Sequence, residues 1–260
     1  MKNPDLARER ARRLGLFGLA KEWERLGAEP WVEKLLGIEE EERARRSLER
    51  RVRAARLGNF KPMADFDWSF PKRIDREGIF DCLQLGFLAE AGNVVLVGPN
   101  GVGKTTIAAN IGHAALLAGH TVLRVTASEM LSDLSMRESA SSLSRRMRRY
   151  LSPTLLLIDE VGYLSYDDKS GDLFFEVVSR RHQVKSIVLT TNRAFAEWNQ
   201  VFPHSSCVTA LVDRLVHKAE IILIEGESFR AKEARERSEK KARERKKKKT
   251  VPKASKGDPA

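Results

Sequence analysis

Cysteine is scarce in this chain, and its scarcity excludes a fold that is held together by disulfide bonds. Cys82 and Cys207 are the only two among 260 residues, and neither lies in a spacing that is typical of a metal site. The chain also lacks an apolar run near the ~20 residues that a membrane-spanning helix needs. Residues 1–5 show no apolar core of a secretory signal. These absences predict a protein of the reducing cytosol, cytoplasmic and without a membrane partner.

Positive charge, by contrast, is abundant and unevenly distributed. The net charge is +11, and residues 231–260 alone contain 13 Lys/Arg and 5 Asp/Glu. This segment lacks apolar periodicity, so we expect a disordered basic tail or at most a frayed helix. Its charge can attract nucleic acid by releasing counterions, or it can simply keep the chain in solution. The sequence leaves both roles open.

Residues 1–60 predict a small helical domain. Apolar side chains recur at helical spacing from Leu6 to Leu26, and Gly27 and Pro30 end this first stretch. A second helical stretch follows over about residues 31–57, in which Gly37 is a candidate break.

The second half of this stretch is rich in arginine. Seven arginines lie between Arg43 and Arg56, against one acid, Glu49. Such a density favours a surface that faces nucleic-acid phosphates, with a solvated helix face as the alternative. The candidate DNA-binding residues of this segment are Arg45, Arg46, Arg50 and Arg53.

Residues 61–92 predict a linker and the start of the next domain, and residues 93–230 predict an α/β core. Within the core, short apolar runs alternate with segments of helical pattern. This alternation indicates a parallel sheet that is covered by helices on both faces. The expected strands are residues 94–97, 121–126, 154–158, 186–191 and 220–224.

The most specific motif is the segment 98–105, Gly-Pro-Asn-Gly-Val-Gly-Lys-Thr, which fits the phosphate-binding pattern G-x-x-x-x-G-K-[ST]. A strand pattern precedes it and a helix pattern follows it, so a chance match is the weaker alternative. Lys104 is then expected to reach the β- and γ-phosphates of ATP, and the Thr105 hydroxyl to ligate Mg²⁺. The candidate nucleotide-binding residues of the loop are Gly98, Pro99, Asn100, Gly101, Val102, Gly103, Lys104, Thr105 and Thr106.

Polar side chains follow the next strands of the core. Asp159 and Glu160 end the apolar run 155–158, at the strand end where ligands lie in open α/β sheets. Downstream of a phosphate loop, Asp159 is expected to orient Mg²⁺ and Glu160 to polarise the attacking water, with solvated acids as the alternative. Asn192 ends the following strand and is a candidate for holding that water, or else a turn residue.

A last candidate lies in the helical segment 208–216. Arg214 stands late in this segment, where an arginine can reach the nucleotide of a neighbouring subunit and stabilise transition-state charge. A surface ion pair made by Asp213 or Arg214 is the alternative, and residue chemistry alone does not decide between them.

Five segments carry a resemblance to a known family. They are 93–99 (Asn-Val-Val-Leu-Val-Gly-Pro), 158–164 (Ile-Asp-Glu-Val-Gly-Tyr-Leu), 189–193 (Leu-Thr-Thr-Asn-Arg) with Trp198 and Phe202 behind it, 213–215 (Asp-Arg-Leu) and 225–230 (Glu-Gly-Glu-Ser-Phe-Arg). In this order they resemble the AAA+ ATPases of the initiator and helicase-loader group. More narrowly, the chain is similar to IstB, the transposition helper ATPase of bacterial insertion sequences, over about residues 5–230.

The resemblance implies a P-loop AAA+ parallel sheet between helices, a small N-terminal helical domain and no full C-terminal lid. One position departs from the family, which more often has His-Leu where this chain has Thr106-Ile107; phosphate binding is unaffected. The implied roles are phosphate and Mg²⁺ binding by Lys104 and Thr105, the metal and water carboxylates at Asp159 and Glu160, the first sensor at Asn192, an arginine finger in trans at Arg214 and a candidate second sensor at Arg230.

The resemblance also implies partners: double-stranded DNA bound without strong sequence preference, a transposase, and further copies of the chain in an ATP-dependent homo-oligomer. Two rival functions share the same core, namely a DnaC-like replicative helicase loader and an ATP-gated DNA-binding assembly protein with little turnover. Between the second and third core strands, where initiator-type ATPases contact DNA, an arginine cluster favours DNA over a solvated helix face. Its members are Arg137, Arg145, Arg146, Arg148 and Arg149.

Overall fold

The computed structural model describes residues 4–136, 140–203 and 207–250, and it divides into two compact units. The N-terminal unit, Met1–Ala55, has a small apolar core that includes Trp23 and Leu36. Arg10 joins the first helix to the last through ion pairs with Glu33 (2.8 Å) and Glu40 (2.7 Å). The helices are α1 (Pro4–Arg13), α2 (Phe17–Lys21), α3 (Trp23–Leu26) and α4 (Pro30–Ala55).

The candidate break at Gly37 is wrong, because α4 is continuous from Pro30 to Ala55. A single glycine inside a helix costs only about 1 kcal/mol relative to alanine. The surrounding run of Leu, Glu and Arg has enough helix propensity to absorb that cost.

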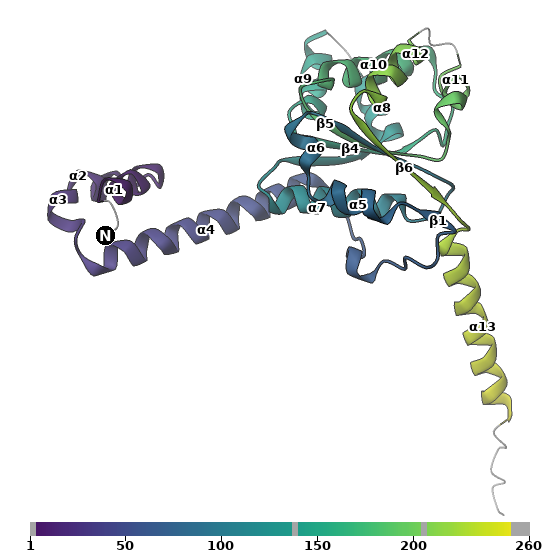
Figure 1. Ribbon diagram of the computed structural model, residues 1–260, viewed down its shortest axis with the longest axis horizontal. Coiled ribbons are helices and arrows are strands. Elements are labelled where there is room, and N and C mark those ends of the chain that lie inside the picture. The colour runs from purple at the N-terminus through teal and green to yellow at the C-terminus, as the bar shows by residue number, and fades with distance from the viewer. Residues whose placement is uncertain (1–3, 137–139, 204–206, 251–260) are drawn as a thin grey trace, which may run out of the picture. The chain divides into compact units, whose positions relative to one another are not determined.

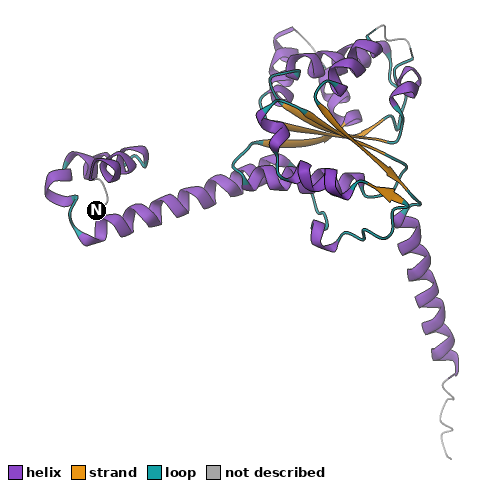
Figure 2. Ribbon diagram, in the orientation of Figure 1, coloured by secondary structure: helices purple, strands orange, loops and turns teal. Residues whose placement is uncertain are grey.

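The second unit, Arg56–Ala260, is built around a six-stranded sheet in the order β1-β6-β2-β5-β4-β3 (Figures 1 and 2). Neighbouring strands from β6 to β3 are parallel, which confirms the predicted sheet. The two-residue strand β1 pairs with β6 in the antiparallel direction at the edge of the sheet. A segment of two residues is too short to show a strand periodicity, so the sequence does not predict it. The strands are β1 (Arg73–Ile74), β2 (Asn93–Val97), β3 (Val122–Thr126), β4 (Leu155–Val161), β5 (Ser186–Thr191) and β6 (Ala219–Glu225).

Helices cover both faces of this sheet (Figure 1). On one face lie α5 and α7; the other face packs the main apolar core against α8, α9, α10 and α12. Among the described residues, no helix is long and apolar enough to span a bilayer. The helices are α5 (Arg76–Leu83), α6 (Gly86–Ala89), α7 (Lys104–Leu117), α8 (Ala127–Ser135), α9 (Ala140–Leu151), α10 (Asp168–Arg181), α11 (Trp198–Val201) and α12 (Val208–Val216), with 3-10 turns η1 (Met63–Asp65) and η2 (Phe195–Glu197).

The described part of the basic tail is helical, and residues 251–260 of the predicted tail lie outside the described residues. Residues from Phe229 to Thr250 form the helix α13, where the sequence predicts disorder or at most a frayed helix. Composition argues against a packed core in this segment, but Ala, Glu, Lys and Arg are all strong helix formers. Acidic and basic residues three and four apart add further local support. Helix propensity therefore decides the conformation although the segment has no apolar face.

A buried arginine ties the amino ends of two strands to α10. The Arg181 side chain donates to the carbonyl oxygens of Tyr150 (2.9 Å), Pro153 (3.0 Å), Thr154 (3.1 Å) and Ser186 (2.7 Å). Burial lowers the pKa of its guanidinium to about 10. Four carbonyls thus depend on one side chain, and the bonds to Tyr150 and Ser186 are fully buried.

We therefore expect Arg181→Met to be strongly destabilising. Loss of the donors leaves buried acceptors unpaired, at a cost of about 3 kcal/mol or more in the free energy of unfolding. Arg180→Met is the matched control, because Arg180 is exposed and forms a helical ion pair with Glu176. We expect a change within about 0.5 kcal/mol. Urea unfolding followed by circular dichroism measures both. Equal midpoints for the two variants would refute the structural role of Arg181.

Candidate active site

The phosphate loop connects β2 to α7 and is shaped by its glycines. Gly101 and Gly103 have φ angles of +81° and +100°, which favour glycine. A Cβ at Gly98 would lie 2.2 Å from the carbonyl oxygen of Ile224, and one at Gly101 would lie 2.2 Å from Ser228 Oγ. The loop therefore presents bare backbone amides ahead of the N-terminus of α7, the arrangement that binds phosphate.

Lys104 points into this loop. Its side chain is buried, and Nζ donates to the carbonyl oxygens of Gly98 (2.6 Å) and Pro99 (2.7 Å). Burial lowers the pKa of the ammonium to about 8. A buried cation whose hydrogen bonds go to two loop carbonyls is a site for an anionic ligand.

Asp159 lies beside the loop, as the sequence predicts for the two motifs. Its buried carboxylate accepts hydrogen bonds from Thr105 Oγ1 (3.1 Å) and from Thr190 Oγ1 (2.5 Å). Thr105 lies in the first turn of α7 and Asp159 near the end of β4, so two distant segments bring a hydroxyl and a carboxylate together. Oxygen ligands of this kind suit Mg²⁺, and together with the loop they fit a magnesium–nucleotide complex.

Arg124 is a site residue that the motifs do not reveal. It projects from β3, where Nη2 forms an ion pair with Asp159 Oδ2 (2.7 Å) and Nη1 donates to the carbonyl oxygen of Leu57 (2.9 Å). The signal was available, since Arg124 is the one charged residue in the apolar strand Val-Leu-Arg-Val-Thr. A cation in a strand covered on both faces indicates a buried acid partner.

Glu160 has an unusual backbone. Its φ is +63°, rare outside glycine, and the pairing of β4 with β5 shifts register between Ile158 and Val161. The Glu160 amide donates to Thr190 Oγ1 (3.0 Å), which fixes this conformation. Such left-handed residues cluster at functional sites because the bulge re-aims a side chain.

Asn192 directly follows β5, whose last residue Thr191 pairs with Val97 beside the phosphate loop. Its Oδ1 is buried and has no hydrogen-bond partner among the residues that the structure describes. Buried acceptors are normally paired, so this oxygen is a group that a ligand or a water would satisfy. Both observations suit the predicted sensor.

Arg214 does not reach the pocket of its own chain. Its Nη1 donates to the carbonyl oxygen of Ala210 (3.2 Å), and its guanidinium lies 4.7 Å from the centre of the Phe175 ring. It is absent from the lining of the pocket around the phosphate loop. Arg214 and the phosphate loop therefore lie apart within one chain.

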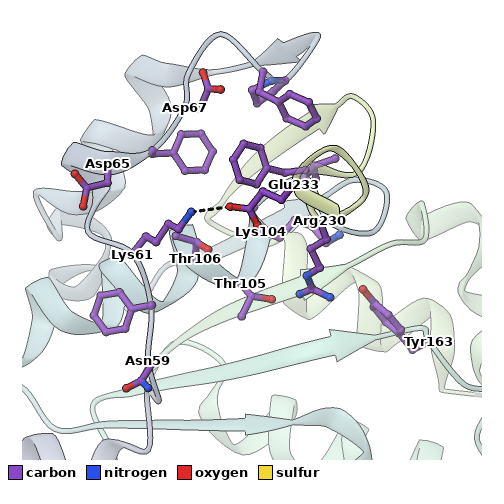
Figure 3. Close-up of a pocket in the computed structure, with 18 residues that line it drawn as sticks. Asn59, Lys61, Asp65, Asp67, Lys104, Thr105, Thr106, Tyr163, Arg230 and Glu233 are labelled. Carbon is purple, nitrogen blue, oxygen red and sulfur yellow. Dashed lines mark hydrogen bonds and ion pairs between the residues drawn. The ribbon is translucent and has the colours of Figure 1, made fainter. Parts of the chain in front are cut away.

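The pocket itself is a cavity of 270 Å³ next to the phosphate loop (Figure 3). Segments far apart in sequence line it: residues 59–71, the loop, Tyr163 and the start of α13. Burial, followed by the charge of Glu160, raises the pKa of the Tyr163 hydroxyl. The aromatic side chains here are Phe60, Phe66, Phe70, Tyr163 and Phe229, joined by the charged residues Lys61, Asp65, Asp67, Lys104, Arg230 and Glu233.

The candidate DNA-binding arginines differ in their surroundings. On α4, Arg45 and Arg46 form ion pairs with Glu42, whereas Arg50 and Arg53 are exposed and have no ion pair within the described part of the chain. On α9, Arg146 and Arg149 form ion pairs with Asp133 (2.5 and 3.3 Å). Arg145 and Arg148 are on the same helix, and Arg137 lies outside the described residues.

Comparison with known proteins identifies relatives of this chain. The family described as IstB-like ATP binding protein matches residues 16–237. A protein of Geobacillus stearothermophilus named for ATP binding and insertion sequence IS5376 is 34% identical over 207 residues, covering 80% of this chain and 82% of that protein. One of Pseudomonas aeruginosa, named for ATP binding and IS21, is 37% identical over 193 residues, covering 74% and 73%. The crystal structure of DnaI, 18% identical, covers 66% of this chain and 90% of that one with a TM-score of 0.53.

Proposed function

The chain belongs to the family of IstB-like ATP-binding proteins, and from this membership we propose that it is an AAA+ ATPase that assembles on double-stranded DNA and assists a transposase. The observation that carries the ATPase proposal is the meeting of Thr105 and Asp159 beside a loop that holds the buried Lys104. Relatives named for insertion sequences support the transposition role.

In this proposal the chain's own residues position the reaction. Bound Mg²⁺-ATP supplies the γ-phosphoryl group. Lys104 and the loop amides would hold the phosphates, and Thr105 and Asp159 would hold Mg²⁺, which would neutralise charge on the phosphate oxygens. Glu160 accepts a proton from the attacking water, and Asn192 orients that water. Arg214 completes the site from a neighbouring copy, so hydrolysis depends on assembly.

Nucleotide binding is tested by Lys104→Ala. This variant loses charge-assisted hydrogen bonds to phosphate, each worth about 1.5–3 kcal/mol, so we expect the Kd for ATP to rise by about 100-fold or more. Lys169→Ala removes an exposed lysine at the start of α10 and should leave the Kd unchanged. Calorimetric titration measures both, and an unaltered Kd in Lys104→Ala would contradict the assignment of the loop.

DNA binding is tested by its salt dependence. Arginines on α4 and α9 and the basic helix α13 offer phosphate contacts, so we expect the affinity to fall by about 10³-fold between roughly 50 and 200 mM salt. Removing residues 242–260, which hold 8 Lys/Arg and 2 Asp/Glu, should lower the slope without stopping hydrolysis. Fluorescence anisotropy on duplexes of unrelated sequence gives the measurement. A flat salt response, or strong preference for one sequence, would count against a phosphate-directed mode.

A further inference from the structure

The start of α13 is built into the wall of the nucleotide pocket. The amide of Phe229 donates to the carbonyl oxygen of Gly101 in the phosphate loop (2.9 Å). From the first turn of α13, Arg230 extends toward Thr105 and Tyr163 (Figure 3). One end of a long charged helix therefore lies against the residues that would hold the phosphates.

The facing wall is the segment 59–71, and it is fixed to α7. Asn110 of α7 donates through Nδ2 to the carbonyl oxygen of Lys61 (2.9 Å) and accepts at Oδ1 from the amide of Met63 (3.1 Å). The Phe66 ring lies 2.7 Å from the position that a Cβ of Gly103 would take. This wall is thus tied to the loop and to the helix that follows it.

Five side-chain contacts join the two walls, and one of them is Lys61 Nζ over the Phe229 ring (5.2 Å). Lys61 pairs with Glu233 (3.1 Å, Figure 3) and Lys232 with Asp67 (3.4 Å). The other two are Lys232 Nζ over the Phe70 ring (4.7 Å) and the edge-to-face contact of Phe70 with Phe229 (5.1 Å). The paired side chains are 37–62% exposed, and such surface pairs contribute little to stability. A bound ligand can therefore shift the equilibrium between the closed and open arrangements of the two walls.

Beyond these contacts α13 is a basic arm. Residues 231–250 contain 11 Lys/Arg and 4 Asp/Glu, and the side chains of residues 234–241 are all exposed. A helix of this composition, with its described side chains facing solvent, is a surface for a polyanion.

We propose that the segment 59–71 and residues 228–233 form a latch over the nucleotide, and that nucleotide in the pocket fixes the basic arm in a position to bind DNA. The inference rests on the proposed function, since it needs a nucleotide in this pocket. A ligand that contacts both walls favours the closed state and restricts the arm, whereas the open latch leaves the arm free.

The first experiment follows the position of the arm in the full chain. Spin labels are attached at Ser238→Cys on α13 and Glu90→Cys at the end of α6, with Cys207→Ser; the buried Cys82, whose pKa burial raises to about 12, stays unlabelled. We expect a broad distance distribution without nucleotide and a narrow one with a saturating non-hydrolysable ATP analogue. The same distribution in both conditions would overturn the proposal.

The second experiment opens the latch. Lys232→Glu places like charge opposite Asp67 and should keep the distribution broad even with the analogue. The exchanged pair Lys232→Glu with Asp67→Lys should restore the narrow one. Lys240→Glu makes the same charge change on exposed α13, outside the latch, and should show the distance distributions of the unmodified chain. A narrow distribution in Lys232→Glu with bound analogue would refute the latch.

The third readout is DNA affinity. We expect the analogue to raise the affinity of the unmodified chain for a duplex by about tenfold. Lys232→Glu should lose this gain, whereas Lys240→Glu should weaken binding equally with and without nucleotide. If Lys232→Glu keeps the gain, nucleotide does not act on DNA affinity through the latch. This result would overturn the inference and leave the proposed function intact. Failure of the unmodified chain to bind nucleotide at all would overturn the proposed function and this inference with it.

Discussion

Glu160→Gln should bind ATP with unchanged affinity and hydrolyse it about 10²–10⁴-fold more slowly than the unmodified chain. Glutamine keeps the shape of the side chain but cannot accept the proton of the attacking water. The backbone of Glu160 is held at φ +63° by the bulge in β4 and by its amide bond to Thr190. Residues held in this uncommon conformation cluster at functional sites.

Single-turnover hydrolysis and nucleotide titration separate the two effects. Glu90→Gln neutralises an exposed carboxylate at the end of α6 and should leave both quantities unchanged. Because it binds ATP without turning it over, Glu160→Gln should also accumulate in the assembled, DNA-bound state. Near-normal turnover would move the general base to another residue.

The sequence predicts the sheet and the phosphate loop because both have local signals. Apolar runs of strand length alternate with helical segments, and the loop motif fixes where β2 ends and α7 begins. The predicted proximity of Thr105 to Asp159 follows from the same rule, that parallel strands present their carboxyl ends on one edge of the sheet.

Other features depend on contacts between distant segments and had no such signal. The edge strand β1 has two residues, and its pairing with β6 depends on the register of Ile74 with Ile224. The segment 59–71 becomes a pocket wall only through the bonds of Asn110 to Lys61 and Met63. Sequence periodicity reports which face of an element is buried, but not which remote segment covers it.

Arg124 belongs to none of the sequence motifs, but its position in an apolar strand is unusual. A lone arginine in an apolar strand violates the expected pattern, and its partner Asp159 turns out to be the carboxylate assigned to Mg²⁺. Arg124 also donates a hydrogen bond to the carbonyl oxygen of Leu57, near the start of the second unit. Local rules tend to fail at functional sites, so the exception was itself informative.

The remaining test concerns Arg214, whose replacement by alanine should lower hydrolysis by about 10³–10⁵-fold while leaving ATP binding intact. Within its own chain the guanidinium lies over Phe175 and outside the pocket. The loose transition state of phosphoryl transfer spreads charge over the γ-phosphoryl oxygens, and an arginine from a neighbour can stabilise it. Hydrolysis should accordingly rise more than linearly with protein concentration and should be stimulated by DNA that gathers the copies.

Mixing decides whether the arginine acts between copies. Arg214→Ala and Lys104→Ala should each be inactive alone, yet a mixture should regain activity, because an intact Lys104 site can receive Arg214 from its neighbour. Lys104→Ala mixed with Glu160→Gln is the control: each site then lacks a residue that acts within its own chain, so no ratio should recover activity. If mixed oligomers form and the first mixture also stays inactive, Arg214 is a local residue of α12, and its contact with Phe175 is its role.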